Sequence, residues 1–253
     1  MKITVIGTGN MGGALVRGWA NAALEQECEL KLTATARTSA RLDKLAEAYP
    51  EVDVTTDNAA AVQGADIVVV AVKPWLVEGV LDSLADSIAK DCLVVSVAAG
   101  ANHPRIDIYT MPNIAVEFGE GMTFVLDDGK VSEANLIAVH DLFAMLGKVM
   151  LVDKKQMDAG NMLAGCGIAY VMRMVRAMME GGVELGLYPD AAKEIATQAM
   201  QGAVAVLEAT GLHPEAAIDK VTTAGGLTIK GLNELDHAGF NSAVIRCLKA
   251  GLK

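Results

Sequence analysis

The sequence has few aromatic residues, a shortage of positive charge and no long uncharged hydrophobic run. Aromatic side chains make up only 4% of the 253 residues, although hydrophobic residues make up 52%. The core must therefore be aliphatic, and a globally disordered chain is excluded. Acidic residues outnumber basic ones by 31 to 21, which gives a formal net charge of −10. This balance argues against a nucleic-acid-binding protein and against docking on an anionic membrane surface.

Membrane, secretion and metal signals are also missing. The longest charge-free apolar stretches, residues 159–172 and 195–207, fall short of the roughly 18 residues that a membrane span needs. No signal peptide precedes the first strand pattern at residues 3–6. The four cysteines lie far apart without CxxC pairs, and the four histidines do not lie at metal-ligand spacing. We therefore expect a cytoplasmic protein with reduced thiols and no metal site.

The pattern of hydrophobic residues predicts two domains that meet near residue 152. In residues 1–152, short apolar runs alternate with helical patterns, and the run at 65–72 is nearly continuous and β-branched, as in a strand buried on both faces. This predicts a Rossmann-type, doubly wound α/β sheet. Residues 153–253 predict an all-α domain.

The helical stretches expected in the second domain are 155–187, 190–210, 213–221 and 228–252. Methionines recur there at helical spacing, which indicates either core packing or a subunit interface.

A glycine-rich sequence joins the first predicted strand to the first predicted helix. It has the pattern GxGxxG and comprises Gly7, Thr8, Gly9, Asn10, Met11 and Gly12. In such a motif the first glycine permits a tight turn, the second lets the backbone approach a pyrophosphate, and the third packs the helix against the strand. The helix N-terminus then presents free N–H groups to the phosphates. The motif therefore predicts dinucleotide binding, the alternative being a simple glycine-rich turn.

The end of the second predicted strand distinguishes NADP from NAD. A domain that selects NAD usually carries Asp or Glu there to accept from the ribose 2′-hydroxyl, whereas this chain carries Arg37 and Thr38. The donor fork of arginine suits a 2′-phosphate, so the sequence favours NADPH, with NADH possible. The alternative is that Arg37 is a solvated surface charge. Ser39 is expected to cap the helix that follows.

Several further motifs, in order along nearly the whole chain, resemble the Δ1-pyrroline-5-carboxylate reductase family, which carries out the last step of proline synthesis. Residues 164–170 resemble the SGSGPAY segment of that family, and residues 182–187 resemble its AGVxLGL turn. Residues 222–229 resemble its TSPGGTTI signature. Weaker matches are at residues 7–13, 71–74, 98–100 and 111–113.

The resemblance implies hydride transfer from NADPH to the C=N carbon of a cyclic imine. It assigns Thr228 as the catalytic residue, in contact with the ring nitrogen. The substrate-binding residues are then Thr223, Gly225, Gly226, Leu227 and Thr228. Glycines in this loop allow backbone N–H groups to converge on the substrate carboxylate. The alternative is an ordinary helix-entry turn with Thr228 as a cap.

The resemblance also implies further cofactor contacts and an oligomer. The expected cofactor-binding residues beyond the glycine loop are Arg37, Thr38, Asn58, Ala71, Val72, Lys73, Pro74, Ala98, Gly100 and Asn113. Lys73 is alternatively a solvated loop lysine. The helical domain of the family forms homodimers, which can assemble further into a decamer.

The chain departs from the family pattern at several positions. Ile168 and Ala224 replace prolines of the two signature segments, and Tyr109 stands where the family usually has arginine. The segment between Gly100 and Met111 has room for little of the helix and strand normally found there. These differences keep two other hypotheses open: a related imine or hydroxyacid-type NADP oxidoreductase, and a dinucleotide sensor without turnover.

Overall fold

The computed structural model describes residues 1–252, which form two compact units. The first unit is Met1–Gly165, and the second begins at Cys166. Helix α6 (Lys154–Gly160) packs against strands β7 and β8 of the first unit. The domain boundary predicted near residue 152 therefore lies before the end of the first compact unit.

The first unit is built on one eight-stranded sheet with the order β3-β2-β1-β4-β5-β6-β7-β8. The strands are β1 (Lys2–Ile6), β2 (Lys31–Thr35), β3 (Asp53–Thr55), β4 (Ile67–Val70), β5 (Leu93–Ser96), β6 (Ile108–Pro112), β7 (Gly121–Leu126) and β8 (Gly147–Val152). All neighbouring pairs are parallel except β6 and β7. This confirms the predicted Rossmann-type α/β class. The chain runs outward from β1 to β3 and then returns to the other side of β1, so the topological switch point lies between β1 and β4.

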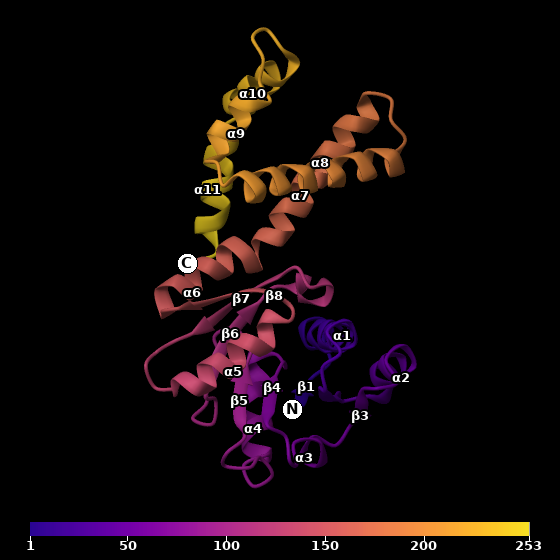
Figure 1. Cartoon of the computed structure of the whole chain (residues 1–253), viewed down its shortest axis with the longest axis vertical. Coiled ribbons are helices and arrows are strands. Elements are labelled where there is room, and N and C mark those ends of the chain that lie inside the picture. Colours follow the sequence, from indigo (N-terminus) through magenta and orange to yellow (C-terminus); the bar gives the residue numbers. More distant parts are fainter. Residues whose placement is uncertain (253) are drawn as a thin grey trace. The chain divides into compact units, whose positions relative to one another are not determined.

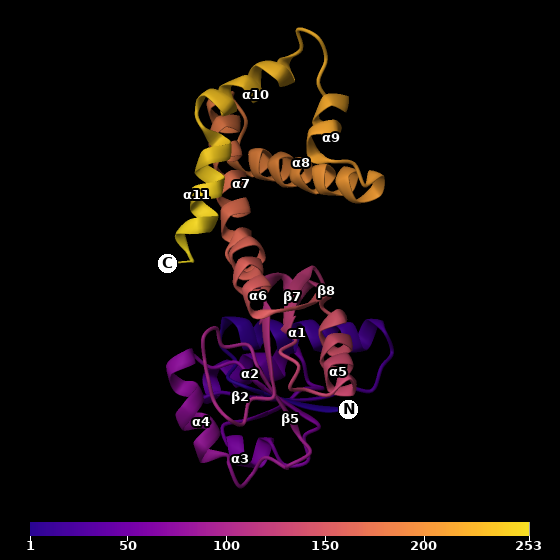
Figure 2. The ribbon, with the colours of Figure 1, turned by 90° about the vertical axis from the view of Figure 1, so that its left-hand side faces the viewer.

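Helices cover both faces of this sheet (Figures 1 and 2). One face carries α1 (Asn10–Glu25), α2 (Ser39–Ala48) and α5 (Glu133–Ala144), and the other carries α3 (Asn58–Ala61) and α4 (Val77–Ser83). Side chains alternate along each central strand, so that Val69 joins the first layer of the core while Val68 and Val70 join the second.

The buried side chains are mostly aliphatic, as the composition predicts. An exception is the pair Trp19 and Phe143, whose rings meet edge to face with centroids 5.4 Å apart. The indole Nε1 of Trp19 donates to the Leu142 carbonyl at 2.9 Å, which satisfies its polar atom in the core.

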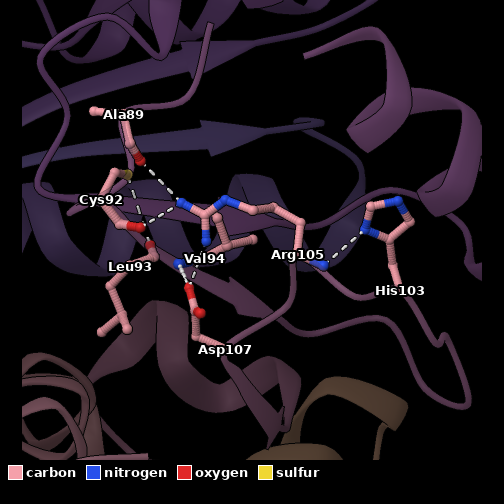
Figure 3. A network of polar contacts seen from close by, with 7 residues as sticks. All are labelled: Ala89, Cys92, Leu93, Val94, His103, Arg105 and Asp107. Atoms are coloured by element: carbon pink, nitrogen blue, oxygen red, sulfur yellow. Dashed lines mark hydrogen bonds and ion pairs between the residues drawn. The ribbon is translucent and has the colours of Figure 1, made fainter. Parts of the chain in front are cut away.

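A short connection without a helix joins the parallel strands β5 and β6, as the spacing predicts (Figure 3), whereas the strand for which the spacing left little room is present as β6. The guanidinium of Arg105 donates to the carbonyls of Ala89 at 3.0 Å and Cys92 at 2.6 Å, and to the carboxylate of Asp107 at 2.8 Å. The Asp107 carboxylate also accepts from the Val94 N–H at 2.8 Å. Parallel strands are usually joined by a crossover helix. In this connection, side-chain hydrogen bonds hold the loop in place instead.

The described residues of the second unit form helices joined by turns, without a strand, which confirms the predicted all-α class. It contains α7 (Gly167–Glu184), α8 (Pro189–Thr210), α9 (Pro214–Lys220), α10 (Leu227–His237) and α11 (Phe240–Ala250). In both views α7 lies against α8, and the two make extensive contact (Figures 1 and 2).

Several local predictions were wrong in detail. The helix expected at 228–252 is two helices, because Gly239 adopts a left-handed φ of +76° between them. A π-helical segment, Asn161–Gly165, separates α6 from α7. Thr38 and not Ser39 occupies the N-cap position of α2, and its side chain makes no capping hydrogen bond.

We predict that Arg105→Ala lowers the free energy of unfolding by about 1–2 kcal/mol, because two carbonyls and a carboxylate lose a charged donor. The measurement is urea unfolding followed by tryptophan fluorescence, since both tryptophans, Trp19 and Trp75, belong to the first unit. Lys130→Ala is the control. It removes an exposed ion pair with Asp128 in the same unit and should cost less than about 0.5 kcal/mol. An equal decrease in the free energy of unfolding in the two variants would show that the hydrogen bonds of Arg105 do not stabilise the β5–β6 connection.

Candidate functional site

The cofactor-binding residues predicted from the sequence gather along one edge of the sheet. Ile6, Thr35 and Val70 end the strands β1, β2 and β4 and are paired in register. Thr55 and Ser96 end β3 and β5 at the same level. Since each predicted residue follows one of these ends or that of β6, the structure places them on the carboxyl side of the sheet. Ligands of open α/β sheets bind there, at the switch point.

Two close approaches fix the glycine loop between β1 and α1. Gly7 has a φ of +96°, and its N–H and that of Thr8 donate to the Thr35 carbonyl at 3.1 and 2.9 Å. A Cβ at Gly12 would collide with the carbonyl oxygen of Gly7. The first and third glycines therefore have the roles that the motif predicts: a left-handed turn and tight helix-to-strand packing.

The second glycine leaves room for a ligand. Apart from Gly9 itself and its chain neighbours, no atom lies within 4 Å of the position of a Cβ at Gly9. Its φ of −71° is one that any residue can adopt, so open space and not backbone conformation distinguishes this position. Gly9 is the N-cap of α1, which has no side-chain cap and no acidic residue in its first turn. The hydroxyl of Thr8 is buried without a hydrogen-bond partner. Free N–H groups, an unpartnered hydroxyl and open space fit the pyrophosphate of a dinucleotide.

A cavity of about 330 Å³ adjoins this loop, between α1 and α2. Thr8, Gly9 and Asn10 line it from the loop side, and Arg41 and Lys44 line it from α2. Arg37, which the sequence assigns to the 2′-phosphate, is exposed and does not line this cavity. Arg41 and Lys44 are not among the residues predicted from the sequence, although the i, i+3 spacing that puts them on one helix face could have indicated them.

The remaining strand ends carry small or exposed residues. Asn58 opens α3 directly after Asp57, whose carboxylate caps that helix by accepting from the Ala60 N–H at 3.1 Å. Lys73 is exposed and precedes a single 3-10 turn, Pro74–Leu76. Ala71, Val72, Ala98 and Gly100 also lie at this edge. These positions are compatible with cofactor contacts, which stay predictions.

Asn113 holds the backbone together at the end of β6. Its Oδ1 accepts from the N–H groups of Ala115 at 3.2 Å and Met122 at 3.4 Å, and its Nδ2 donates to the Ala164 carbonyl at 3.4 Å. These contacts use the carbonyl oxygen and one of the two N–H donors of the Asn113 amide. The structure therefore gives Asn113 a structural role, and its predicted ligand contact stays a prediction.

In the second unit, the predicted substrate-binding residues form one tight turn before α10. The Gly226 N–H donates to the Thr223 carbonyl at 2.9 Å, and a Cβ at Gly226 would lie 2.5 Å from the Thr223 hydroxyl. Gly225 has a φ of +72°. Leu227 begins α10, so the N–H of Thr228 belongs to the uncapped first turn. The turn brings Thr223, Gly225, Gly226 and Thr228 together, as an anion-binding loop requires.

The residues that depart from the family pattern have evident places in the fold. Ile168 lies in the first turn of α7, where proline is tolerated and not required. Tyr109 lies in β6, and its hydroxyl accepts from the His103 N–H at 3.4 Å. Tyr109 therefore helps to support the short β5–β6 connection.

Comparisons with known proteins agree with this geometry. Residues 2–100 match the family model "NADP oxidoreductase coenzyme F420-dependent". Residues 154–253 match the model "Pyrroline-5-carboxylate reductase dimerisation". The fold, the glycine loop and the first match define the class: an NAD(P)-dependent oxidoreductase with a Rossmann-type domain.

Relatives and solved structures narrow the class to a family. The chain is 36% identical over 222 residues to a pyrroline-5-carboxylate reductase of Synechocystis sp., with 85% of this chain and 82% of the relative covered. It is 32% identical over 259 residues to that of Pisum sativum, covering 98% and 92%. The chain belongs to the pyrroline-5-carboxylate reductase family.

Two further comparisons place the chain within that family. It is 33% identical to pyrroline-5-carboxylate reductase 1 of Dictyostelium discoideum over 96% of its own length, but spans only 47% of that relative. The crystal structure of Plasmodium falciparum pyrroline carboxylate reductase with NADP bound has a TM-score of 0.86 and 25% identity, covering 99% of this chain and 95% of that one.

We predict that Gly9→Ala weakens NADPH binding by about tenfold or more and changes the free energy of unfolding by less than about 0.5 kcal/mol. The added methyl group meets open space in the free protein but lies where the phosphates approach. Gly12→Ala should instead destabilise the protein by about 1–3 kcal/mol through its clash with the Gly7 carbonyl.

The measurements are fluorescence titration with NADPH and urea unfolding. Gly79→Ala is the matched control, since Gly79 lies in α4 with no neighbour within 4 Å and away from the loop. It should leave NADPH affinity unchanged and raise the free energy of unfolding by up to about 1 kcal/mol, because alanine favours the helix more than glycine does. Normal NADPH affinity in Gly9→Ala would show that the phosphates do not pass over Gly9.

Proposed function

We propose that this chain reduces 1-pyrroline-5-carboxylate to L-proline with NADPH, in the cytoplasm. The observation that carries the proposal is that one chain contains two candidate anion-binding sites, one for the cofactor and one for the substrate. The first is the carboxyl edge of the sheet, where helix α1 has no side-chain cap and the Thr8 hydroxyl has no hydrogen-bond partner. The second is the glycine turn before α10. The family membership supports the choice of substrate.

The first unit holds the cofactor in this proposal. Residues 9–12 bind the pyrophosphate, Arg37 and Thr38 face the adenosine ribose, and the small residues Ala98 and Gly100 leave space for the nicotinamide ring. When bound, NADPH supplies the hydride for the C=N carbon.

The turn in the second unit holds the substrate. Backbone N–H groups at Gly225 and Gly226 and the first turn of α10 attract the carboxylate of the imine. The Thr228 hydroxyl contacts the ring nitrogen and orients the protonated imine. Little further acid–base machinery is needed, because a protonated C=N bond is already electrophilic.

A homodimer explains the surface of the second unit. Large hydrophobic side chains are exposed on α7 at Val171, Met174 and Met178, whose i, i+3, i+7 spacing puts them on one face. In this unit Ala192 and Ala196 are the fully buried hydrophobic residues among those described. Because so much of this apolar surface is exposed to solvent, it requires a partner, and a second copy of the chain supplies one. Further assembly, up to a decamer, extends the same proposal.

A membrane would be the other way to cover these side chains. Within residues 1–252, the helical stretch Lys154–Glu184 contains an 18-residue window with a mean hydropathy of 1.3, which by length and composition is apolar enough to cross a bilayer. Charged residues interrupt this stretch, so a search for charge-free runs does not find it. The dimerisation match over residues 154–253 favours a protein partner.

The direct test is oxidation of NADPH, followed by absorbance, in the presence of 1-pyrroline-5-carboxylate. We expect turnover with this imine and formation of proline. Turnover of another imine only would contradict the substrate, and tight NADPH binding without any turnover would favour a dinucleotide sensor.

The role of Thr228 makes a second prediction. Thr228→Ala should lower kcat/KM by about tenfold to a hundredfold, the value of one hydrogen bond to a charged group, while Thr228→Ser restores most of it. Thr210→Ala is the matched control in the same unit, because the Thr210 hydroxyl donates to the Val206 carbonyl of its own helix. An unchanged kcat/KM in Thr228→Ala would remove its assigned role.

We also predict that the protein sediments in detergent-free buffer at twice the 26.4 kDa chain mass, or a multiple of it. Met174→Asp should shift it toward the monomer, because the charge lies on the exposed face of α7. Leu24→Asp, which charges an exposed apolar position of the first unit, should leave the mass unchanged. A wild-type monomer at micromolar concentration would contradict the dimer.

A further inference from the structure

The cavity between α1 and α2 carries positive charge that the fold does not neutralise. Three cationic side chains line it: Arg17, Arg41 and Lys44. Arg17 is committed to Glu117, since its Nε and Nη2 donate to the two carboxylate oxygens at 2.7 Å each. This pairing raises the pKa of Arg17 and lowers that of Glu117.

Arg41 and Lys44, by contrast, are exposed at the cavity wall and have no ion-pair partner among the described residues, and no carboxylate lines the cavity there. They lie three residues apart on α2, so both side chains extend from the same helix face. Two uncompensated cations in a chain with a net charge of −10 indicate a site for an anion.

The glycine loop, which is the proposed pyrophosphate site, lines the same cavity. Thr8 of this loop is only 8% exposed, and its hydroxyl has no hydrogen-bond partner. Leaving a buried hydroxyl unpaired costs free energy, which the pyrophosphate would recover, and a dinucleotide bound at this loop brings its adenosine ribose toward the same cavity.

We propose that Arg41, assisted by Lys44, binds the 2′-phosphate of NADPH in this cavity and so sets the preference for NADPH over NADH. The inference rests on the proposed function and adds a specificity residue to it. A phosphomonoester carries a charge of about −1.5 to −2 near pH 7, which two cations match. The pyrophosphate already has the free N–H groups of α1, whereas the 2′-phosphate needs side-chain donors, and arginine supplies them as a fork.

The test measures binding of NADP⁺ and NAD⁺ by calorimetry, without substrate. In Arg41→Ala we expect the Kd for NADP⁺ to rise by about tenfold to a hundredfold and the Kd for NAD⁺ to change by less than about twofold. Arg41→Lys should lie between. Lys44→Ala should act in the same direction and less strongly. Adenosine 2′,5′-bisphosphate should lose affinity as NADP⁺ does, whereas AMP should not.

Lys31→Ala is the matched control, because it removes an exposed cation at the opposite end of β2. It should change neither Kd. Equal weakening of both dinucleotides by Arg41→Ala would assign Arg41 to the pyrophosphate and overturn the proposal, as would an effect confined to Arg37→Ala. Selective NADP⁺ binding without imine turnover would contradict the proposed reductase alone, since this titration does not depend on catalysis.

Discussion

The close contact between Gly12 and the carbonyl of Gly7 is the constraint on which the first unit depends. Because neither residue has a side chain there, α1 can begin directly against the end of β1. A second close approach lies two turns later, where a Cβ at Gly18 would collide with the Val116 carbonyl. Between them Arg17 pairs with Glu117. Helix α1 is thus fixed at two points, and its free N-terminus is held at the ligand edge of the sheet.

The sequence predicts this part of the fold well because its signals are local. A β-branched run, a glycine motif and an alternation of strands with helices each act within a few residues. The antiparallel strand β7 and the break at Gly239 escaped prediction for a different reason. Strand β7 is defined by its pairing with β6 and β8, and Gly239 reads as an ordinary helical residue until its positive φ is known.

The same distinction applies to the candidate site. The roles of Gly7 and Gly12 follow from the motif, and the structure reproduces them. Asn113 follows a strand as a ligand residue would, but its amide is used by three backbone groups that only the folded chain brings to it. Arg41 belongs to no sequence motif. Only the folded chain shows that it lines the same cavity as the glycine loop.

The acidic composition acquires a meaning from these local arrangements. With a net charge of −10, the whole-protein field repels an anionic cofactor and an anionic substrate alike. Affinity must therefore come from short-range donors in places where the long-range field counts for little: helix N-termini, an unpaired hydroxyl and unneutralised cations. Since such donors act through direct hydrogen bonds, they discriminate between ligands that differ by one phosphate. In an acidic reductase, cofactor specificity is then a property of a few contacts and not of the protein's overall charge.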